Sequence, residues 1–238
     1  MLDPLNPPEL TASRWFNADA PPTLKALLGK VVVVAAFQTH CPGSNKWGMP
    51  QAQRLANNFN DDEVAVIGLN TAFEDLNKQD AKAIEAFIAE HGITFPVAKD
   101  QPDGTETPKT MTAYELQGTP AILILDRQGR LRRHYLGQVD DIRLAAEIMG
   151  FVIEARDAPR EISAALERRF ASALVDPDAH HHHDHDGGCC GGHGDSHDHD
   201  HAHDGGCCGG AHTHDHSHDR SSEAAKADCG DPSCGCKS

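Results

Sequence analysis

The end of the chain lacks large apolar side chains. In a sequence of 238 residues, no Leu, Ile, Val, Met, Phe, Tyr or Trp follows Val175. A segment without such residues cannot bury enough surface to offset the entropy lost on ordering, which excludes a second hydrophobic core. We therefore expect one domain of ordinary size over residues 1–178 and a disordered, low-complexity tail over residues 179–238.

The sequence also lacks a long apolar run. None approaches the ~20 residues that a membrane-spanning helix needs. The opening stretch MLDPLNPPEL has no basic segment followed by an apolar one, as a secretory leader would. We expect no membrane partner and a cytoplasmic location.

Positive charge is scarce, since 21 Lys and Arg face 36 Asp and Glu, for a net charge of −15. From Ala179 onward eleven acidic and three basic residues give the tail −8, which leaves −7 for the domain. Both parts would repel a phosphate backbone, so we expect no nucleic-acid partner.

Cysteine is almost absent from the domain, because seven of the eight cysteines lie in the tail and only Cys41 precedes it. Thiols stay largely reduced in the cytoplasm, so the cysteines are interpreted as reactive or metal-binding rather than as structural disulfides. A redox pair would place its second cysteine three residues after the first. This chain has Ser44 there.

Hydrophobic periodicity predicts an α/β domain. The unbroken apolar run within 30–37 is typical of a strand buried on both faces, as in parallel sheets. Further strands are expected at 64–70, 121–125 and 130–136, and helices at 42–58, 78–91, 140–156 and 160–174. A short segment at 94–98 follows the second of these helices. Trp15 and Phe16 indicate an N-terminal edge feature, and the stretch between 98 and 118 reads as a polar loop. The order βαβα, then a hairpin, then helices predicts a thioredoxin-like fold, a mixed central sheet flanked by helices.

Four stretches carry a resemblance to a known family: LLGKVVVVAAFQTHCPGS, VAVIGLNTAFED, ITFPVAKD and GTPAILILDRQGRL. In this order, over about 140 residues, they resemble the thioredoxin-like superfamily, in particular the redoxin branch with TlpA-like thiol:disulfide reductases and AhpC/TSA antioxidant proteins. The resemblance implies that Pro120 is cis and lies against the thiol of Cys41. It also implies that Thr119 offers backbone hydrogen bonds to an extended peptide.

Cys41 falls at a strand-to-helix turn. A thiol there faces unpaired backbone N–H groups and the positive end of the helix dipole, which favour the thiolate. The Ser44 hydroxyl can donate a hydrogen bond to that thiolate. His40 could add positive charge, although we interpret it as a polar turn residue rather than a base. The candidate catalytic residues are Cys41, Ser44, Thr119 and Pro120; the alternative is a buried, inert cysteine.

Ser44 cannot resolve a mixed disulfide, because a hydroxyl is not an adequate nucleophile at neutral pH. Three routes remain open: resolution by an external thiol such as glutathione, resolution by a tail cysteine, or loss of turnover. A peroxidase is less well supported. Peroxiredoxin-type sites carry a proline seven residues before the cysteine and Thr or Ser three before it, where this chain has Val34 and Gln38. Oxidation to a sulfenic acid stays possible.

The tail is rich in metal-binding side chains. Fourteen histidines alternate with aspartates, and the block GGCCGG occurs at 187–192 and again at 205–210. Imidazole and thiolate bind Zn²⁺, Ni²⁺ and copper, and the flanking glycines let the backbone fold around an ion. The candidate ligands are His180, His181, His182, His183, His185, Cys189, Cys190, His193, His197, His199, His201, His203, Cys207, Cys208, His212, His214, His216, His218, Cys229, Cys234 and Cys236.

Two functions from different classes follow. The first is a thiol oxidoreductase in which Cys41 forms a mixed disulfide or sulfenic acid that another thiol resolves. Its partners would be a low-molecular-weight thiol or a protein thiol or disulfide, and no cofactor is expected in the domain. The second is a catalytically weak platform whose tail buffers or delivers transition metals. An inert solubilising linker is the remaining alternative for the tail, although a linker needs no cysteine pairs.

Overall fold

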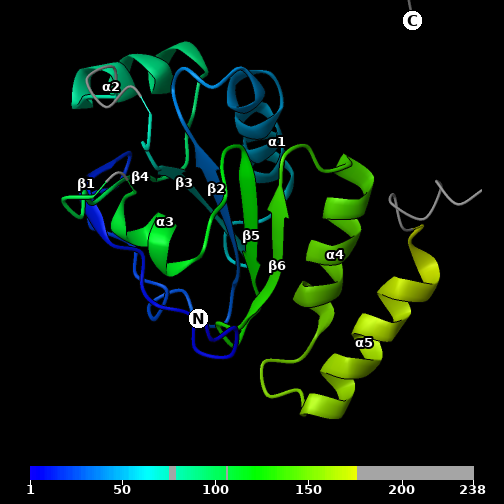
Figure 1. Ribbon diagram of the computed structural model, residues 1–238. Coiled ribbons are helices and arrows are strands. Elements are labelled where there is room, and N and C mark those ends of the chain that lie inside the picture. The colour runs from blue at the N-terminus through cyan, green and yellow to red at the C-terminus, as the bar shows by residue number, and fades with distance from the viewer. Residues whose placement is uncertain (75–78, 106, 176–238) are drawn as a thin grey trace, which may run out of the picture. The chain divides into compact units, whose positions relative to one another are not determined.

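A six-stranded mixed sheet forms the centre of the domain in the computed structural model, which describes residues 1–175 except 75–78 and 106 (Figure 1). The order of the strands across the sheet is β1-β4-β3-β2-β5-β6. The bounds are β1 (Ala12–Phe16), β2 (Val31–Phe37), β3 (Val64–Asn70), β4 (Val97–Asp100), β5 (Ala121–Leu125) and β6 (Leu131–Leu136).

The strand β2 is central and buried on both faces, as its run of valines predicts. It pairs in parallel with β3 and antiparallel with β5, and β5 continues into the antiparallel hairpin strand β6. Alternate residues of β2 enter two different hydrophobic clusters: Val31 and Val33 one, Val32 and Val34 the other. The end of β2, where Cys41 follows, is therefore rigidly placed.

The helices cover both faces of the sheet. Those described are a π-helical turn η1 (Ser44–Gly48), α1 (Met49–Asn58), α2 (Ala81–Glu90), α3 (Lys109–Ala113), α4 (Asp141–Ile153) and α5 (Arg160–Ala173). Side chains of α1, α2 and α4 share one cluster with β2, and α3 joins the N-terminal segment in the cluster on the other face. The predicted alternation of strands and helices is confirmed.

Three elements differ from the sequence prediction. The strand β4 runs from Val97 to Asp100, where only a short segment at 94–98 was expected. The helix predicted to begin at 78 begins at Ala81, because the Asp80 carboxylate caps it by accepting the Ala83 N–H. Position 78 itself lies outside the described residues. The helix α3 lies in the stretch predicted as a loop. The buried Asp100 carboxylate accepts hydrogen bonds from the N–H groups of Thr110 and Met111 in α3. The local sequence does not predict this contact.

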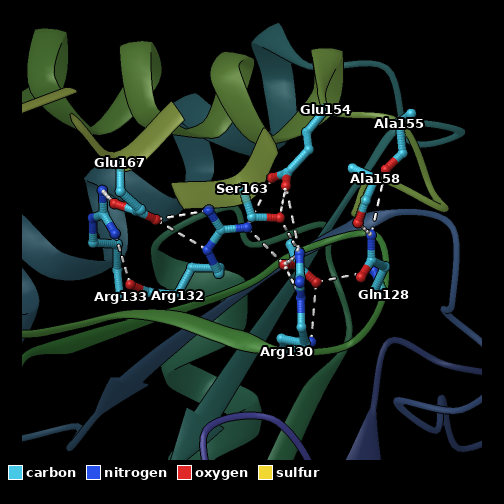
Figure 2. A network of polar contacts seen from close by, with 10 residues as sticks. Gln128, Arg130, Arg132, Arg133, Glu154, Ala155, Ala158, Ser163 and Glu167 are labelled. Atoms are coloured by element: carbon cyan, nitrogen blue, oxygen red, sulfur yellow. Dashed lines mark hydrogen bonds and ion pairs between the residues drawn. The ribbon is translucent and has the colours of Figure 1, made fainter. Parts of the chain in front are cut away.

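A buried ion network fastens α4 and α5 to the edge strand β6 (Figure 2). Arg132 contacts Asp126 at 2.8 Å, Glu154 at 2.7 Å and Glu167 of α5 at 2.7 Å. The side chains of Asp126 and Glu154 are only 3% exposed, so they depend on these partners. Ser163 of α5 adds a hydrogen bond to Glu154. The network thus attaches α5 to the edge strand β6.

None of the helices in the described part of the chain is long and apolar enough to cross a membrane. The predicted boundary between domain and tail, at 178 and 179, lies outside the described residues, as do all the predicted metal ligands of the tail.

Candidate active site around Cys41

Cys41 lies four residues beyond the end of β2, where the chain winds into a helix. The Asn45 N–H donates to the Cys41 carbonyl at 3.0 Å, the first helical hydrogen bond. The helix predicted at 42–58 is confirmed, with one difference: the turn Ser44–Gly48 is π-helical before α1 proper begins. Such turns are frequent at functional sites.

The structure brings all four predicted catalytic residues together. The Cys41 thiol donates to the Thr119 carbonyl at 3.3 Å, and the Ser44 N–H donates to the Cys41 sulfur at 3.4 Å. The Thr119–Pro120 peptide bond is cis, as the family resemblance implies. Residues 41–44 and 119–120, far apart in sequence, therefore form one site.

Two glycines allow Pro120 to approach the turn. A Cβ on Gly43 would lie 2.9 Å from Pro120 Cδ, and a Cβ on Gly48 would lie 2.7 Å from Pro120 Cβ. Real Cβ atoms essentially never come this close, so a side chain at either position would push the proline away from the turn. The fit between Cys41 and Thr119 depends on this packing.

The electrostatics around the sulfur favour the thiolate. Partial burial raises the pKa of Cys41, but hydrogen bonds from the Ser44 side chain and from backbone N–H groups of the turn outweigh burial and lower that pKa below its ordinary value. Ser44 is fully buried, and its oxygen accepts the Gln38 N–H at 3.4 Å. The hydroxyl proton of Ser44 is therefore free to point at the sulfur.

Cys41 opens into a cleft of about 310 Å³. The cleft is lined by residues from the turn, from the loop after β3 and from the loop before β5: Gln38, His40, Cys41, Pro42, Phe73, Glu74, Gln79, Gly118 and Thr119. Because the thiol is partly exposed there, a disulfide can reach it from solvent.

A buried amide pair behind the thiol was not predicted from the sequence. Gln79 Nε2 donates to Gln38 Oε1 at 2.9 Å, and Gln38 Nε2 donates to the Thr119 hydroxyl at 3.4 Å. Gln79 Oε1 accepts the Thr39 N–H at 3.1 Å. The pair thus ties the Cys41 turn to Thr119. Gln79 is 41 residues from Gln38 and lies outside the four stretches that carry the family resemblance.

No cluster of three or more His, Cys, Asp or Glu side chains that could hold a metal ion occurs among the described residues. The metal ligands predicted in the tail lie outside the described residues.

Comparison with known proteins agrees with this geometry. The sequence pattern of the AhpC/TSA family matches residues 8–134, more than half of the chain. A thioredoxin-like superfamily protein of known crystal structure is 44% identical, with a TM-score of 0.62 over 64% of this chain and 97% of its own. A thiol-disulfide isomerase from Corynebacterium glutamicum is 41% identical, with a TM-score of 0.61 over 63% of this chain and 98% of its own. No curated protein matches the chain.

The match spans the strand before Cys41, the turn itself and the cis-proline strand, so it covers every residue of the site. The fold predicted from the sequence is confirmed for the domain. The chain belongs to the AhpC/TSA family of thioredoxin-like oxidoreductases.

Proposed function

We propose that the protein is a monothiol disulfide oxidoreductase in which Cys41 is the sole nucleophile of the domain. The observation that carries this proposal is the pairing of a thiol of lowered pKa with Ser44, a hydrogen-bond donor, at the position where a second thiol would resolve the intermediate. The chemistry of the similar isomerase supports thiol–disulfide exchange as the reaction.

In the proposed cycle the Cys41 thiolate attacks one sulfur of a substrate disulfide. A mixed disulfide forms, the substrate S–S bond breaks, and one substrate thiolate leaves. A low-molecular-weight thiol such as glutathione then attacks the substrate sulfur of the mixed disulfide. The Cys41 thiolate leaves, stabilised by hydrogen bonds from Ser44. A reducing compartment such as the cytoplasm would supply that thiol.

The test is a disulfide-reduction assay with glutathione as the electron donor, together with mass spectrometry of the acid-quenched enzyme. We expect a mixed disulfide on Cys41 and no turnover by Cys41→Ser. In Ser44→Cys, a second thiol can resolve the intermediate within the turn, so the mixed disulfide should stop accumulating at low glutathione. Turnover by Cys41→Ser would contradict the proposal, since it would place the reaction elsewhere in the chain.

We propose a second function for the tail, as a buffer or carrier of transition metals. Its fourteen histidines and seven cysteines support this, because imidazole and thiolate together suit Zn²⁺, Ni²⁺ and copper. Imidazole sites favour Cu²⁺ and Ni²⁺ over Zn²⁺ in the test tube, whereas availability decides occupancy in the cell. Titration with each metal, followed by native mass spectrometry, should show several ions per chain; a chain that binds none would contradict this function.

A further inference from the structure

His40, beside the reactive thiol, is hydrogen-bonded to Thr39, which is in turn bonded to a buried side chain. It is exposed, it immediately precedes Cys41, and it lines the same cleft. Its Nδ1 atom lies 2.9 Å from the hydroxyl oxygen of Thr39, and Thr39 is itself held by the buried Gln79. The thiol mechanism proposed above gives no role to this arrangement.

The hydrogen bonds indicate which nitrogen of charged His40 can release its proton. Gln79 Oε1 accepts the Thr39 backbone N–H at 3.1 Å and the Asn70 amide at 2.9 Å, so this atom is the oxygen of the Gln79 side chain. The Thr39 hydroxyl lies 3.3 Å from the same oxygen and can donate its single proton to it. In the charged ring both nitrogens of His40 carry a proton, so Nδ1 donates to Thr39 Oγ1, and the Thr39 hydroxyl proton goes to Gln79.

When the charged ring gives up a proton, the Nδ1 proton is held by Thr39, so Nε2 is the nitrogen that releases it. Because His40 lines the cleft, this nitrogen can donate its proton to a group bound there and take a proton back once the ring is neutral. Gln79 is 2% exposed and Thr39 8% exposed, so the chain that orients the ring is shielded from competing water.

We propose that His40 is the general acid and base of the thiol–disulfide exchange, and that Thr39 and Gln79 are the residues that position it. This inference rests on the proposed function and assigns the proton transfers that it leaves open.

The proton transfers balance over the cycle. In the first half, the Cys41 thiolate attacks the substrate disulfide, and protonated His40 gives its Nε2 proton to the departing substrate thiolate. In the second half, neutral His40 takes the proton of the incoming low-molecular-weight thiol as that thiol attacks the mixed disulfide. The Cys41 thiolate leaves, and His40 is again protonated for the next cycle.

The test compares two disulfides whose leaving groups differ in their need for a proton. Bis(2-hydroxyethyl) disulfide releases a basic alkyl thiolate, whereas 5,5′-dithiobis(2-nitrobenzoate) releases an acidic aromatic thiolate that leaves without help. We expect His40→Gln in the full-length protein to slow mixed-disulfide formation with the alkyl disulfide by ~100-fold. The aromatic disulfide should react within about twofold of the wild-type rate, because its leaving group needs no acid.

The positioning residues have a matched pair of variants. Thr39→Val removes the hydroxyl that holds His40 but keeps the side-chain shape, and Thr39→Ser keeps the hydroxyl. We expect Thr39→Val to slow the alkyl disulfide selectively by about tenfold and Thr39→Ser to react at close to the wild-type rate.

An equal loss for both disulfides in His40→Gln would overturn the inference, since it would mean that His40 only shapes the turn. Unchanged rates with both would overturn it as well. The monothiol mechanism fails separately, through turnover that survives in Cys41→Ser. The two failures are therefore distinguishable with the same assay.

Discussion

At the scale of single residues, the main feature of the site is Ser44, a hydroxyl at the position where a dithiol site has its second cysteine. A thiol there could both stabilise the Cys41 thiolate and resolve its mixed disulfide, whereas a hydroxyl can only stabilise it. Ser44 does so from a fully buried position, with its oxygen held by the Gln38 N–H. The residue thus separates the two roles that a dithiol site combines.

Replacing Ser44 with Ala should raise the pKa of Cys41. The wild-type side chain lowers this pKa by donating a hydrogen bond to the sulfur. Without it, the thiolate is protonated at a higher pH than in the wild type. We expect slower alkylation by iodoacetamide at pH 7 and a pH profile displaced upward, with the rate at high pH unchanged. Ser172→Ala is the control, because Ser172 is exposed on α5 and its hydroxyl donates to the Arg169 carbonyl, far from Cys41 in the sequence. A profile that stays in place would show that Ser44 is not the thiolate's donor.

At the scale of elements, the sequence predicts well where burial and periodicity agree. The strand β2, the helix after Cys41 and the helices α4 and α5 were predicted within a few residues of their observed bounds. The prediction failed for β4 and α3. The first occupies only four residues, and the second is held by hydrogen bonds to the distant Asp100 carboxylate rather than by its own pattern. The residues of α3 alone do not indicate that Asp100 will bond them.

The residues of the candidate site differ in the same way. Cys41, Ser44, Thr119 and Pro120 could be predicted, because they lie in local motifs: a strand-to-helix turn and a Gly-Thr-Pro sequence. Gln79 was not predicted, because its contacts are to Gln38 and Thr39, about 40 residues earlier in the chain, and only the fold of the loop after β3 brings them together. Residues that support a site through tertiary hydrogen bonds need the fold to reveal them.

The network on β6 predicts a large difference between two arginine substitutions. Arg132→Met would remove one of the two arginines that contact the buried carboxylates of Asp126 and Glu154, and Arg130 would remain. We expect this to lower the free energy of unfolding by about 3 kcal/mol. Arg54→Met is the matched control, since Arg54 pairs with Asp141 while both are 54% exposed, and such pairs contribute about 0–1 kcal/mol. Urea unfolding of the two variants measures the difference. Equal losses would mean that the buried network does not hold α5.

The contact between α4 and α5 gives a second prediction at this scale. A Cβ on Gly150 would collide with the ring of Phe170, which packs edge-on against Phe151. We expect Gly150→Ala to destabilise the domain by about 1–3 kcal/mol through overpacking. Phe170→Leu should cost less in the Gly150→Ala background than in the wild type, because it removes the collision. Additive effects in thermal unfolding would contradict the close approach of the two helices.

At the scale of the whole molecule, the chain joins two parts of different physical character. The similar proteins of known structure are covered over 97% and 98% of their own lengths, yet they account for only 64% and 63% of this chain. The thioredoxin-like part is therefore equivalent to an entire relative. All the large apolar residues lie within residues 1–175, so that part contains its own core.

Deleting residues 179–238 should therefore separate the two proposed functions. The remaining domain keeps the ion network on β6 and every residue of the Cys41 site, so we expect an unchanged alkylation profile and glutathione-dependent turnover within about twofold of the full chain. Metal binding should disappear, because the fourteen clustered histidines and seven cysteines are removed. Both are measured on the same sample, by thiol assay and by titration with Zn²⁺, Ni²⁺ and Cu²⁺. A large fall in turnover would instead indicate that a tail cysteine resolves the mixed disulfide, and restoring Cys189 and Cys190 alone would then test which pair does so.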